Sequence, residues 1–251
     1  MIELLKGDCL EVMKEIKSES IDAIICDPPY GTTACKWDSV IDFKLMWEQL
    51  NRIIKKNGAI VLFGSEPFSS ALRMSNIKNY KYDWYWRKPK GTGHLNAKKM
   101  PMKDTETISV FQESINYNPV FSKGQPYKNK TGKNKAGDSS MTDSYGKYTN
   151  FRNNNTGFRY PKAGLDFPVV ERGSLHPTQK PIPLMEYLIK TYTNENEIVL
   201  DFTMGSGSTG VGCVNLNRQF IGIEQDENYY NICVQRIEDA KKERDKLTLF
   251  K

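Results

Sequence analysis

The sequence predicts an α/β protein built on a doubly wound, mostly parallel sheet. Apolar runs alternate with helical apolar spacing over residues 1–76 and again over residues 181–246. The runs Ile21–Cys26 and Ala59–Phe63 are almost wholly apolar, as in parallel strands covered on both faces. The segment 199–216 passes from an apolar run through a glycine-rich turn into a helix. Such alternation favours a Rossmann-like sheet that binds ligands at the carboxyl ends of its strands.

The amino-terminal elements are expected to alternate between strand and helix. Asn57-Gly58 is a typical helix C-cap signal, so we expect the second helix to stop there. The strands are expected at residues 2–6, 21–26 and 59–63, and the helices at residues 9–17, 41–56 and 67–76.

The middle of the chain differs in composition from both ends. Residues 82–87 and 106–111 are rich in aromatic and β-branched side chains, which predicts strands on either side of a basic loop. Residues 122–164 are rich in Lys, Asn, Gly, Ser and Tyr and have no strand or helix period. A structureless stretch of that length is usually functional or disordered, so we interpret it as an insertion.

Regular structure is expected again after the insertion. Pro181-Ile182-Pro183 is a typical helix start. Helices are expected at residues 181–193 and 226–246, and strands at residues 197–202 and 220–224. Residues 205–216 are expected to form a Gly/Ser-rich turn that enters a helix.

The overall composition, with 38% hydrophobic and 26% charged residues, fits a globular protein. No apolar run approaches the roughly 18 residues of a membrane span, and the first residues lack the apolar core of a signal peptide. We therefore expect no membrane partner and a cytoplasmic location. The five cysteines form no CxxC pair, and with only His94 and His176 as histidines a metal site is not expected.

The net charge of +6 is unevenly distributed. Residues 78–103 and residues 123–162 each carry +7, so the rest of the chain carries −8. Two basic segments are therefore set into an acidic body. They are either solvated loops or a surface that binds a polyanion, and we favour the second interpretation.

A glycine-rich turn, GSGSTG, follows the apolar run that ends at Asp201-Phe202. Such a turn brings the backbone close to a ligand, and the helix that begins near Ser208 offers free N–H groups. Glu224 ends the next strand, where a carboxylate can accept hydrogen bonds from both hydroxyls of a ribose. The alternatives are a turn packed with small residues for structural reasons and a dinucleotide dehydrogenase. Because an acidic strand end repels a nucleotide phosphate, it suits a cationic ligand better, such as S-adenosylmethionine.

The tetrapeptide Asp27-Pro28-Pro29-Tyr30 follows a buried run and is expected at the same edge of the sheet. Two prolines fix φ and remove two N–H donors, which leaves the Asp27 carboxylate and the Pro28 carbonyl as acceptors. These acceptors suit an amino group that donates two hydrogen bonds, and the Tyr30 ring suits stacking on a base. An ordinary Asp-Pro-Pro turn with a surface tyrosine is the alternative.

The motifs DPPY and DFTMGSGSTG together resemble those of the amino-methylating DNA methyltransferases, which act on adenine N6 or cytosine N4. HPTQKP at residues 176–181 is similar to the cofactor-side motif of their β group, in which DPPY also precedes the glycine turn. The resemblance implies a circularly permuted, seven-stranded methyltransferase sheet whose chain ends lie close together. It implies a catalytic half over residues 1–121, a target-recognition insertion over 122–170 and a cofactor-binding half over 171–251.

The resemblance also implies the reaction. We expect methyl transfer from S-adenosylmethionine to adenine N6 in duplex DNA, with the target base flipped out and no covalent enzyme intermediate. The expected catalytic residues are Asp27, Pro28, Pro29 and Tyr30. The expected cofactor-binding residues are Asp8, His176, Thr178, Lys180, Asp201, Phe202, Gly205, Gly207, Ser208, Thr209 and Glu224. The expected DNA contacts are Lys88, Lys90, Lys98, Lys99, Lys128, Lys130, Lys133, Lys135, Arg152 and Arg159.

Several alternatives stay open at this point, including a homodimer. Cytosine-N4 members of the family more often have Ser where Asp27 stands, which favours adenine and leaves cytosine as the second choice. An RNA base is also open, because phosphate contacts distinguish the two sugars poorly. An inactive DNA-binding module is disfavoured because both motifs are intact, and a glutamine methyltransferase would have Asn in place of Asp27 and the glycine turn first.

Replacing Lys128, Lys130, Lys133 and Lys135 together with Ala should reduce the salt dependence of DNA binding, because fewer counterions are released on binding. Binding of S-adenosylmethionine should not change. DNA affinity measured over a range of salt concentrations checks this. If the DNA affinity and its dependence on salt concentration do not change, residues 78–103 become the better candidates for the phosphate contacts.

Overall fold

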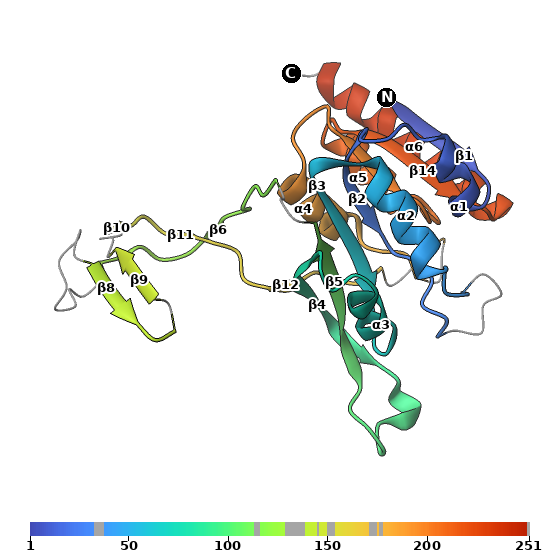
Figure 1. Ribbon diagram of the computed structural model, residues 1–251. Helices are drawn as coiled ribbons and strands as arrows, with labels where there is room; N and C mark the ends of the chain where they lie inside the picture. Colours follow the sequence, from blue (N-terminus) through green and yellow to red (C-terminus); the bar gives the residue numbers. More distant parts are fainter. Residues whose placement is uncertain are drawn as a thin grey trace. The chain divides into compact units, whose positions relative to one another are not determined.

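The computed structural model describes residues 1–32, 38–112, 116–128, 139–144, 146–149, 154–170, 175 and 178–249 (Figure 1). The chain divides into a larger unit, Met1–Asn118 with Ala163–Lys251, and a smaller unit, Pro119–Lys162. Several expected site residues lie outside the described residues, namely His176, Lys130, Lys133, Lys135, Arg152 and the side chain of Lys128.

An eight-stranded sheet forms the larger unit, in the order β1-β14-β13-β2-β3-β5-β4-β12. β5 is antiparallel to both of its neighbours, and the other pairings in the sheet are parallel. The expected doubly wound, mostly parallel sheet is therefore confirmed. It has one strand more than expected, because three residues after the insertion pair with β4 at the edge.

The strands of this sheet are β1 (Ile2–Lys6), β2 (Ile21–Cys26), β3 (Ile54–Gly64), β4 (Tyr80–Thr92), β5 (Lys103–Phe111), β12 (Gly164–Asp166), β13 (Ile198–Asp201) and β14 (Gln219–Glu224). The helices are α1 (Cys9–Val12), α2 (Phe43–Ile53), α3 (Phe68–Ser75), α4 (Ile182–Tyr192), α5 (Ser208–Asn215) and α6 (Glu227–Leu249), with 3-10 turns η1 (Met13–Glu15) and η2 (His94–Asn96). No helix in the described part of the chain combines the length and apolar character of a membrane span.

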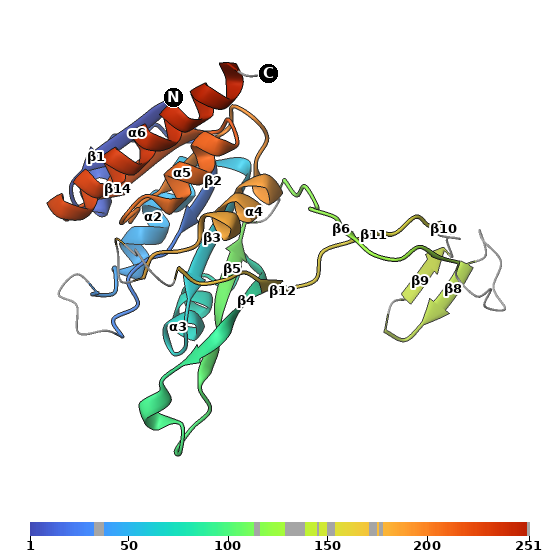
Figure 2. The same ribbon diagram turned by 180° about the vertical axis from the view of Figure 1, so that it is seen from behind.

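Helices cover both faces of the sheet (Figures 1 and 2). Side chains of β2 alternate between two buried clusters: Ala23 and Ile25 belong to one, and Ile24 and Cys26 to the other. The first cluster also contains side chains of α4, α5 and α6, and the second contains side chains of η1, α2 and α3. Because both faces are covered, the interior strands are apolar on both sides, which is the pattern seen in the sequence.

The second helix ends earlier than expected. α2 stops at Ile53 and β3 begins at Ile54, so Asn57-Gly58 lies within a strand and is not a helix C-cap. The register of β3 against β2 shifts between the pairs Ile21–Ile54 and Ala23–Ala59. A Cβ atom on Gly58 would lie 2.6 Å from Ile54 Cδ1 and 2.7 Å from the Asp22 carbonyl oxygen. Gly58 is therefore required by close packing at the irregularity in β3.

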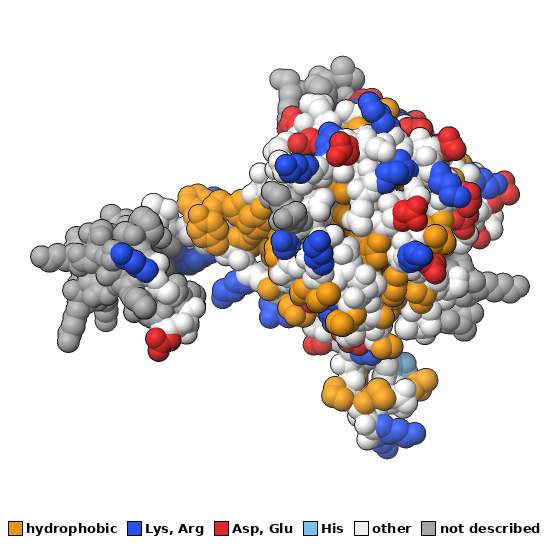
Figure 3. All heavy atoms as spheres, viewed as in Figure 1, with side chains coloured by type: hydrophobic (Ala, Val, Ile, Leu, Met, Phe, Trp, Pro, Cys, Tyr) orange, Lys and Arg blue, Asp and Glu red, His pale blue; other side chains and the backbone are white. Residues whose placement is uncertain are grey.

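The basic segment between the two aromatic-rich strands is more regular than expected. β4 and β5 continue into it as a long antiparallel hairpin that pairs Thr92 with Lys103. The hairpin end carries exposed apolar side chains, with Leu95 87% exposed and Met100 55% exposed. Figure 3 shows these orange side chains beside blue Lys and Arg side chains at the end of the hairpin.

Circular permutation is visible in the strand order. β1, the first strand of the chain, pairs in parallel with β14, the last. Tyr230 of α6 donates a hydrogen bond of 3.2 Å to the Leu4 carbonyl oxygen, and both views place the start of β1 near the end of α6 (Figures 1 and 2). As a result, β13 pairs with β2, and the segments that follow these two strands meet at one edge of the sheet.

The smaller unit consists of short antiparallel pairs. β6 (Ser122–Lys123) pairs with β11 (Phe158–Arg159), β7 (Tyr127–Lys128) with β10 (Asn154–Asn155), and β8 (Ser139–Thr142) with β9 (Gly146–Thr149). The ring of Phe121 lies 4.8 Å from that of Tyr160. The unit ends at Lys162, before the expected boundary at residue 170, because β12 belongs to the main sheet.

Gly58→Ala should lower the free energy of unfolding by about 1–3 kcal/mol, because the added methyl group overlaps Ile54 and the Asp22 carbonyl. Lys56→Ala, at an exposed position of the same strand, should change it by no more than about 0.5 kcal/mol. Chemical denaturation of both variants measures the difference. Equal stabilities would mean that β3 can accommodate a side chain at this irregularity.

Candidate active site

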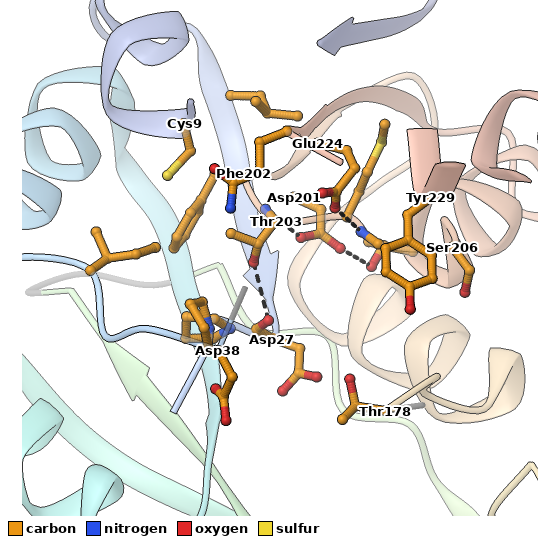
Figure 4. Close-up of a pocket in the computed structure, with 18 of the residues that line it drawn as sticks. Cys9, Asp27, Asp38, Thr178, Asp201, Phe202, Thr203, Ser206, Glu224 and Tyr229 are labelled. Atoms are coloured by element: carbon orange, nitrogen blue, oxygen red, sulfur yellow. Dashed lines mark hydrogen bonds between the residues drawn. The ribbon is translucent and has the colours of Figure 1, made fainter. Parts of the chain in front are cut away.

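A cavity of about 250 Å³ lies at the edge of the sheet where β2 and β13 end (Figure 4). The residues that follow the two strands form much of its wall. Its lining includes all four expected catalytic residues, Asp27, Pro28, Pro29 and Tyr30. It also includes the expected cofactor-binding residues Asp8, Thr178, Lys180, Asp201, Phe202, Gly205, Ser208, Thr209 and Glu224.

The Asp27 carboxylate is held by two other side chains at the edge of the cavity. Its Oδ1 accepts a hydrogen bond from the Tyr30 hydroxyl, and its Oδ2 accepts one from the Lys180 ammonium group. Thr203, in the glycine-turn segment, donates a 3.1 Å hydrogen bond to the Asp27 carbonyl oxygen (Figure 4). Burial raises the pKa of Asp27, and Lys180 opposes this effect. Tyr30 and Lys180 thus fix the carboxylate of Asp27, and Thr203, which follows β13, fixes its backbone carbonyl.

Asp38 fixes the backbone of the turn, and sequence reasoning missed it. Its Oδ1 accepts hydrogen bonds from the N–H groups of Tyr30 at 2.7 Å and Gly31 at 2.8 Å. Its Oδ2 accepts one from Thr32 at 2.9 Å. A lone Asp eight positions after the tetrapeptide's Tyr carries no motif signal, so only the tertiary structure identifies this role.

One face of the Tyr30 ring is already covered. Phe68 stacks on it with ring centroids 5.0 Å apart and an angle of 29° between the rings. Burial and the neighbouring Asp27 raise the pKa of the Tyr30 hydroxyl well above its usual range. Tyr30 therefore remains a protonated hydrogen-bond donor, and it lines the cavity.

Glu224 connects the glycine turn to the end of β14. Its Oε2 accepts a 2.9 Å hydrogen bond from Gly205 N–H, and its Oε1 accepts a 2.8 Å hydrogen bond from Asp226 N–H. Gly205 has φ of 50°, a conformation that side chains disfavour. Each carboxylate oxygen can accept a second hydrogen bond, so Glu224 is pre-oriented and still able to bind hydroxyl groups.

Gly207 does not line the cavity, although the sequence placed it among the ligand-binding residues. A Cβ atom there would lie 2.4 Å from Cys233 Sγ, and φ is 80°. Gly207 is therefore needed for close packing of α5 against α6. The glycine pattern alone could not separate this structural role from ligand contact.

Asp201 is 5% exposed and acts mainly within the fold. It accepts hydrogen bonds from the Thr209 hydroxyl at 2.6 Å and from Thr203 N–H at 3.3 Å. Burial raises its pKa to about 6, which means that the folded state holds the proton more tightly than the unfolded state does. The contribution of Asp201 to stability is therefore full in acid and falls as the pH rises towards 6.

The cavity is strongly acidic. Carboxylates of Asp8, Asp27, Asp38, Asp201 and Glu224 contribute to its lining. Lys180 is the only Lys or Arg among the lining residues that the structure describes, and its ammonium group is bound to Asp27. Such a lining fits a cationic ligand and disfavours a phosphate.

The expected DNA contacts fall into two groups. Lys90, Lys98 and Lys99 are exposed on the β4–β5 hairpin. The Lys88 side chain is only 15% exposed and forms an ion pair with Glu106, so the structure argues against its binding a phosphate. In the smaller unit, Arg159 donates a 2.6 Å hydrogen bond to the Gln125 carbonyl oxygen.

Asp38→Ala should speed hydrogen exchange at the amides of Tyr30, Gly31 and Thr32 by about tenfold or more, because all three lose their acceptor. Asp166→Ala, which removes an exposed carboxylate from β12, is the control. Hydrogen exchange followed by mass spectrometry resolves this segment. Unchanged protection in Asp38→Ala would show that the turn is stiff without the carboxylate.

Comparison with known proteins agrees with this geometry. A family model described as DNA methylase, of the N6/N4 methyltransferase type, matches residues 21–235. DNA adenine methyltransferase YhdJ of Escherichia coli is 29% identical over 94% of this chain and 83% of its own length. The crystal structure of an M1.HpyAVI–SAM complex is 29% identical, with a TM-score of 0.62 over 94% of this chain and 99% of that one.

The PvuII cytosine-N4-specific DNA methyltransferase has the same fold, with a TM-score of 0.64 and 17% identity over 95% of this chain and 90% of that one. A family match over most of the sequence coincides with a site in which both family motifs meet. The chain therefore belongs to the N6/N4 family of DNA methylases.

Proposed function

We propose that this protein is a site-specific DNA methyltransferase that transfers a methyl group from S-adenosylmethionine to adenine N6. The observation that carries the proposal is the Asp27 carboxylate held at the mouth of an acidic cavity, beside the glycine turn. The glycine-turn side of the cavity suits a cationic methyl donor, and the side formed by the tetrapeptide suits an amine that donates hydrogen bonds.

The residues of the glycine-turn side fit the cofactor. Glu224 is pre-oriented to accept hydrogen bonds from the ribose hydroxyls, and Asp8, Thr178, Ser208 and Thr209 lie around the same cavity. The carboxylate lining suits the ammonium group and the sulfonium. When bound, S-adenosylmethionine supplies an activated methyl group, and its sulfur leaves as a neutral thioether.

The residues of the DPPY side act on the target base. Asp27 and the Pro28 carbonyl accept the two amine hydrogens, which draws the nitrogen lone pair out of the ring system and towards the methyl group. After transfer the nitrogen carries one proton too many, and Asp27 accepts it before it passes to solvent. The raised pKa of Asp27 suits this step.

The two described cysteines at the site do not support a covalent intermediate. Cys26, which precedes the motif, is fully buried, and burial raises the pKa of its thiol well above the usual range. Burial and the neighbouring Asp8 raise the pKa of Cys9, which lines the cavity, to about 12. Direct transfer relies instead on positioning and electrostatics. The target base has to leave the duplex to reach Asp27, and Tyr30, which lines the cavity, would hold it by stacking.

Adenine is favoured over cytosine by two observations. Aspartate stands at position 27, where cytosine-N4 members of the family more often have serine. A relative named as a DNA adenine methyltransferase is 29% identical, whereas the cytosine-N4-specific PvuII enzyme shares the fold at 17% identity.

The DNA contacts are assigned to two regions. Exposed Lys90, Lys98 and Lys99 on the β4–β5 hairpin would bind phosphates. The smaller unit, with its basic and aromatic composition, would recognise the target sequence in the duplex.

Asp27→Ala should abolish methyl transfer and leave S-adenosylmethionine binding nearly intact, because Glu224 and the glycine turn hold the cofactor. Asp239→Ala, an exposed carboxylate on α6, is the control. The assay incubates unmethylated DNA, and RNA in a parallel reaction, with cofactor and identifies the modified nucleoside by mass spectrometry. N6-methyl-2′-deoxyadenosine is the expected product. N4-methyl-2′-deoxycytidine, or a methylated nucleoside found only in the RNA reaction, would contradict the assignment of adenine in DNA as the substrate.

A further inference from the structure

Charged groups of alternating sign connect the β4–β5 hairpin to the catalytic carboxylate. Lys88 of β4 binds Glu106 of β5, Glu106 faces Lys180, and Lys180 binds Asp27. Every side chain in this series is largely buried, with exposures of 15% for Lys88, 15% for Glu106, 8% for Lys180 and 20% for Asp27. A buried charge series of this kind is costly unless every member is paired.

Lys180 lies between two carboxylates and two aromatic rings. Its Nζ donates to Asp27 Oδ2 and lies 3.5 Å from Glu106 Oε2. The Phe63 and Tyr30 ring centroids are 5.1 Å and 5.9 Å from the same nitrogen. The ammonium group therefore has two acceptors within reach and apolar surroundings elsewhere.

Glu106 Oε2 is the unexplained atom of the series. Lys88 occupies Oε1, which fixes the side chain. Oε2 is buried and, among the described residues, accepts no hydrogen bond. A buried carboxylate oxygen without a hydrogen bond costs free energy and calls for an explanation. The group that it faces is the Lys180 ammonium.

Both oxygens of Asp27 already accept one hydrogen bond, from Tyr30 at Oδ1 and from Lys180 at Oδ2. While the Lys180 ammonium stays on Oδ2, its positive charge makes the carboxylate a weaker acceptor for the target amine. The amine is therefore bound best once Lys180 has moved away. Displacing Lys180 into an apolar pocket would leave a buried ammonium group without a partner, which is a heavy cost.

We propose that Lys180 is a positioning residue that exchanges between Asp27 Oδ2 and Glu106 Oε2. Its ammonium group donates a hydrogen bond to Asp27 Oδ2 until the target amine binds, and then donates one to Glu106 Oε2 instead. This inference rests on the proposed function, because it describes how the same carboxylate is made available to the base.

The exchange moves a charge over a short distance without moving a proton. Burial alone would lower the pKa of Lys180, but Asp27 and Glu106 together raise it, so the group stays an ammonium ion. Burial alone would raise the pKa of Glu106, but Lys180 and Lys88 lower it, so the group stays a carboxylate. One charge-assisted hydrogen bond replaces another, and Asp27 is released at little net cost.

Glu106→Gln removes the charged acceptor and should hold Lys180 on Asp27. The expected result is a fall of about tenfold or more in the single-turnover rate of methyl transfer to unmethylated duplex DNA, with the dissociation constant of S-adenosylmethionine unchanged. Glu66→Gln, which neutralises a carboxylate in the unrelated Arg73 ion pair, is the matched control and should keep the wild-type rate.

The double variant Lys180→Met/Glu106→Gln separates exchange from a purely structural role. Without Lys180 nothing covers Asp27 Oδ2, so the double variant should transfer faster than Glu106→Gln alone. Loss of buried charge pairing for structural reasons would instead make the double variant as slow as the single one, or slower. If Glu106→Gln does not fold, Glu106→Asp keeps the charge, withdraws the acceptor from Lys180 and should give an intermediate rate.

A Glu106→Gln rate within about twofold of wild type overturns the inference, and so does a double variant no faster than the single one. Both results leave the methyltransferase proposal standing. A wild-type protein that transfers no methyl group to DNA overturns the proposed function and this inference together.

Discussion

The parallel pairing of β2 with β13 is the constraint on which the rest of the site depends. Helical connections lead away from this pair in opposite directions along the sheet, so the turns after the two strands are not covered by a crossover. DPPY follows one strand and the glycine turn follows the other. Their contact is direct, because Thr203 after β13 donates a hydrogen bond to the backbone carbonyl of Asp27 after β2.

The site concentrates negative charge that a folded protein would otherwise avoid. Burial raises the pKa values of Asp201 and Glu224, so their ionised forms oppose folding near neutral pH. Backbone N–H groups and hydroxyls offset part of this cost at both carboxylates. A cationic ligand between them would offset more, so binding of S-adenosylmethionine should also stabilise the fold.

Two kinds of support hold the Asp27-Pro28-Pro29-Tyr30 tetrapeptide. The Asp38 carboxylate binds three backbone N–H groups and fixes the path of the turn. Lys180 and Tyr30 fix the Asp27 carboxylate itself. The first support is permanent, since no reaction needs those N–H groups, whereas we propose that Lys180 leaves Asp27 when the substrate binds. The β4–β5 hairpin connects to this second support through Lys88 and Glu106, so an element with exposed basic residues is joined to the catalytic carboxylate.

Local patterns in the sequence predicted the alternating strands and helices of a mostly parallel sheet and located the two motif segments, because apolar runs, glycine turns and prolines act on nearby residues. The permuted strand order followed only from the resemblance to the family. The tertiary structure alone decided the features that depend on distant partners. Gly58 packs closely against the Asp22 carbonyl and Gly207 against Cys233, and the Asp38 carboxylate accepts a hydrogen bond from the Tyr30 N–H group. It also showed that Lys88, which the sequence suggested as a phosphate contact, forms a buried ion pair with Glu106, and that Lys180 forms an ion pair with Asp27. A residue's type shows which contacts it can make, and only the packing of remote segments decides which partner it meets.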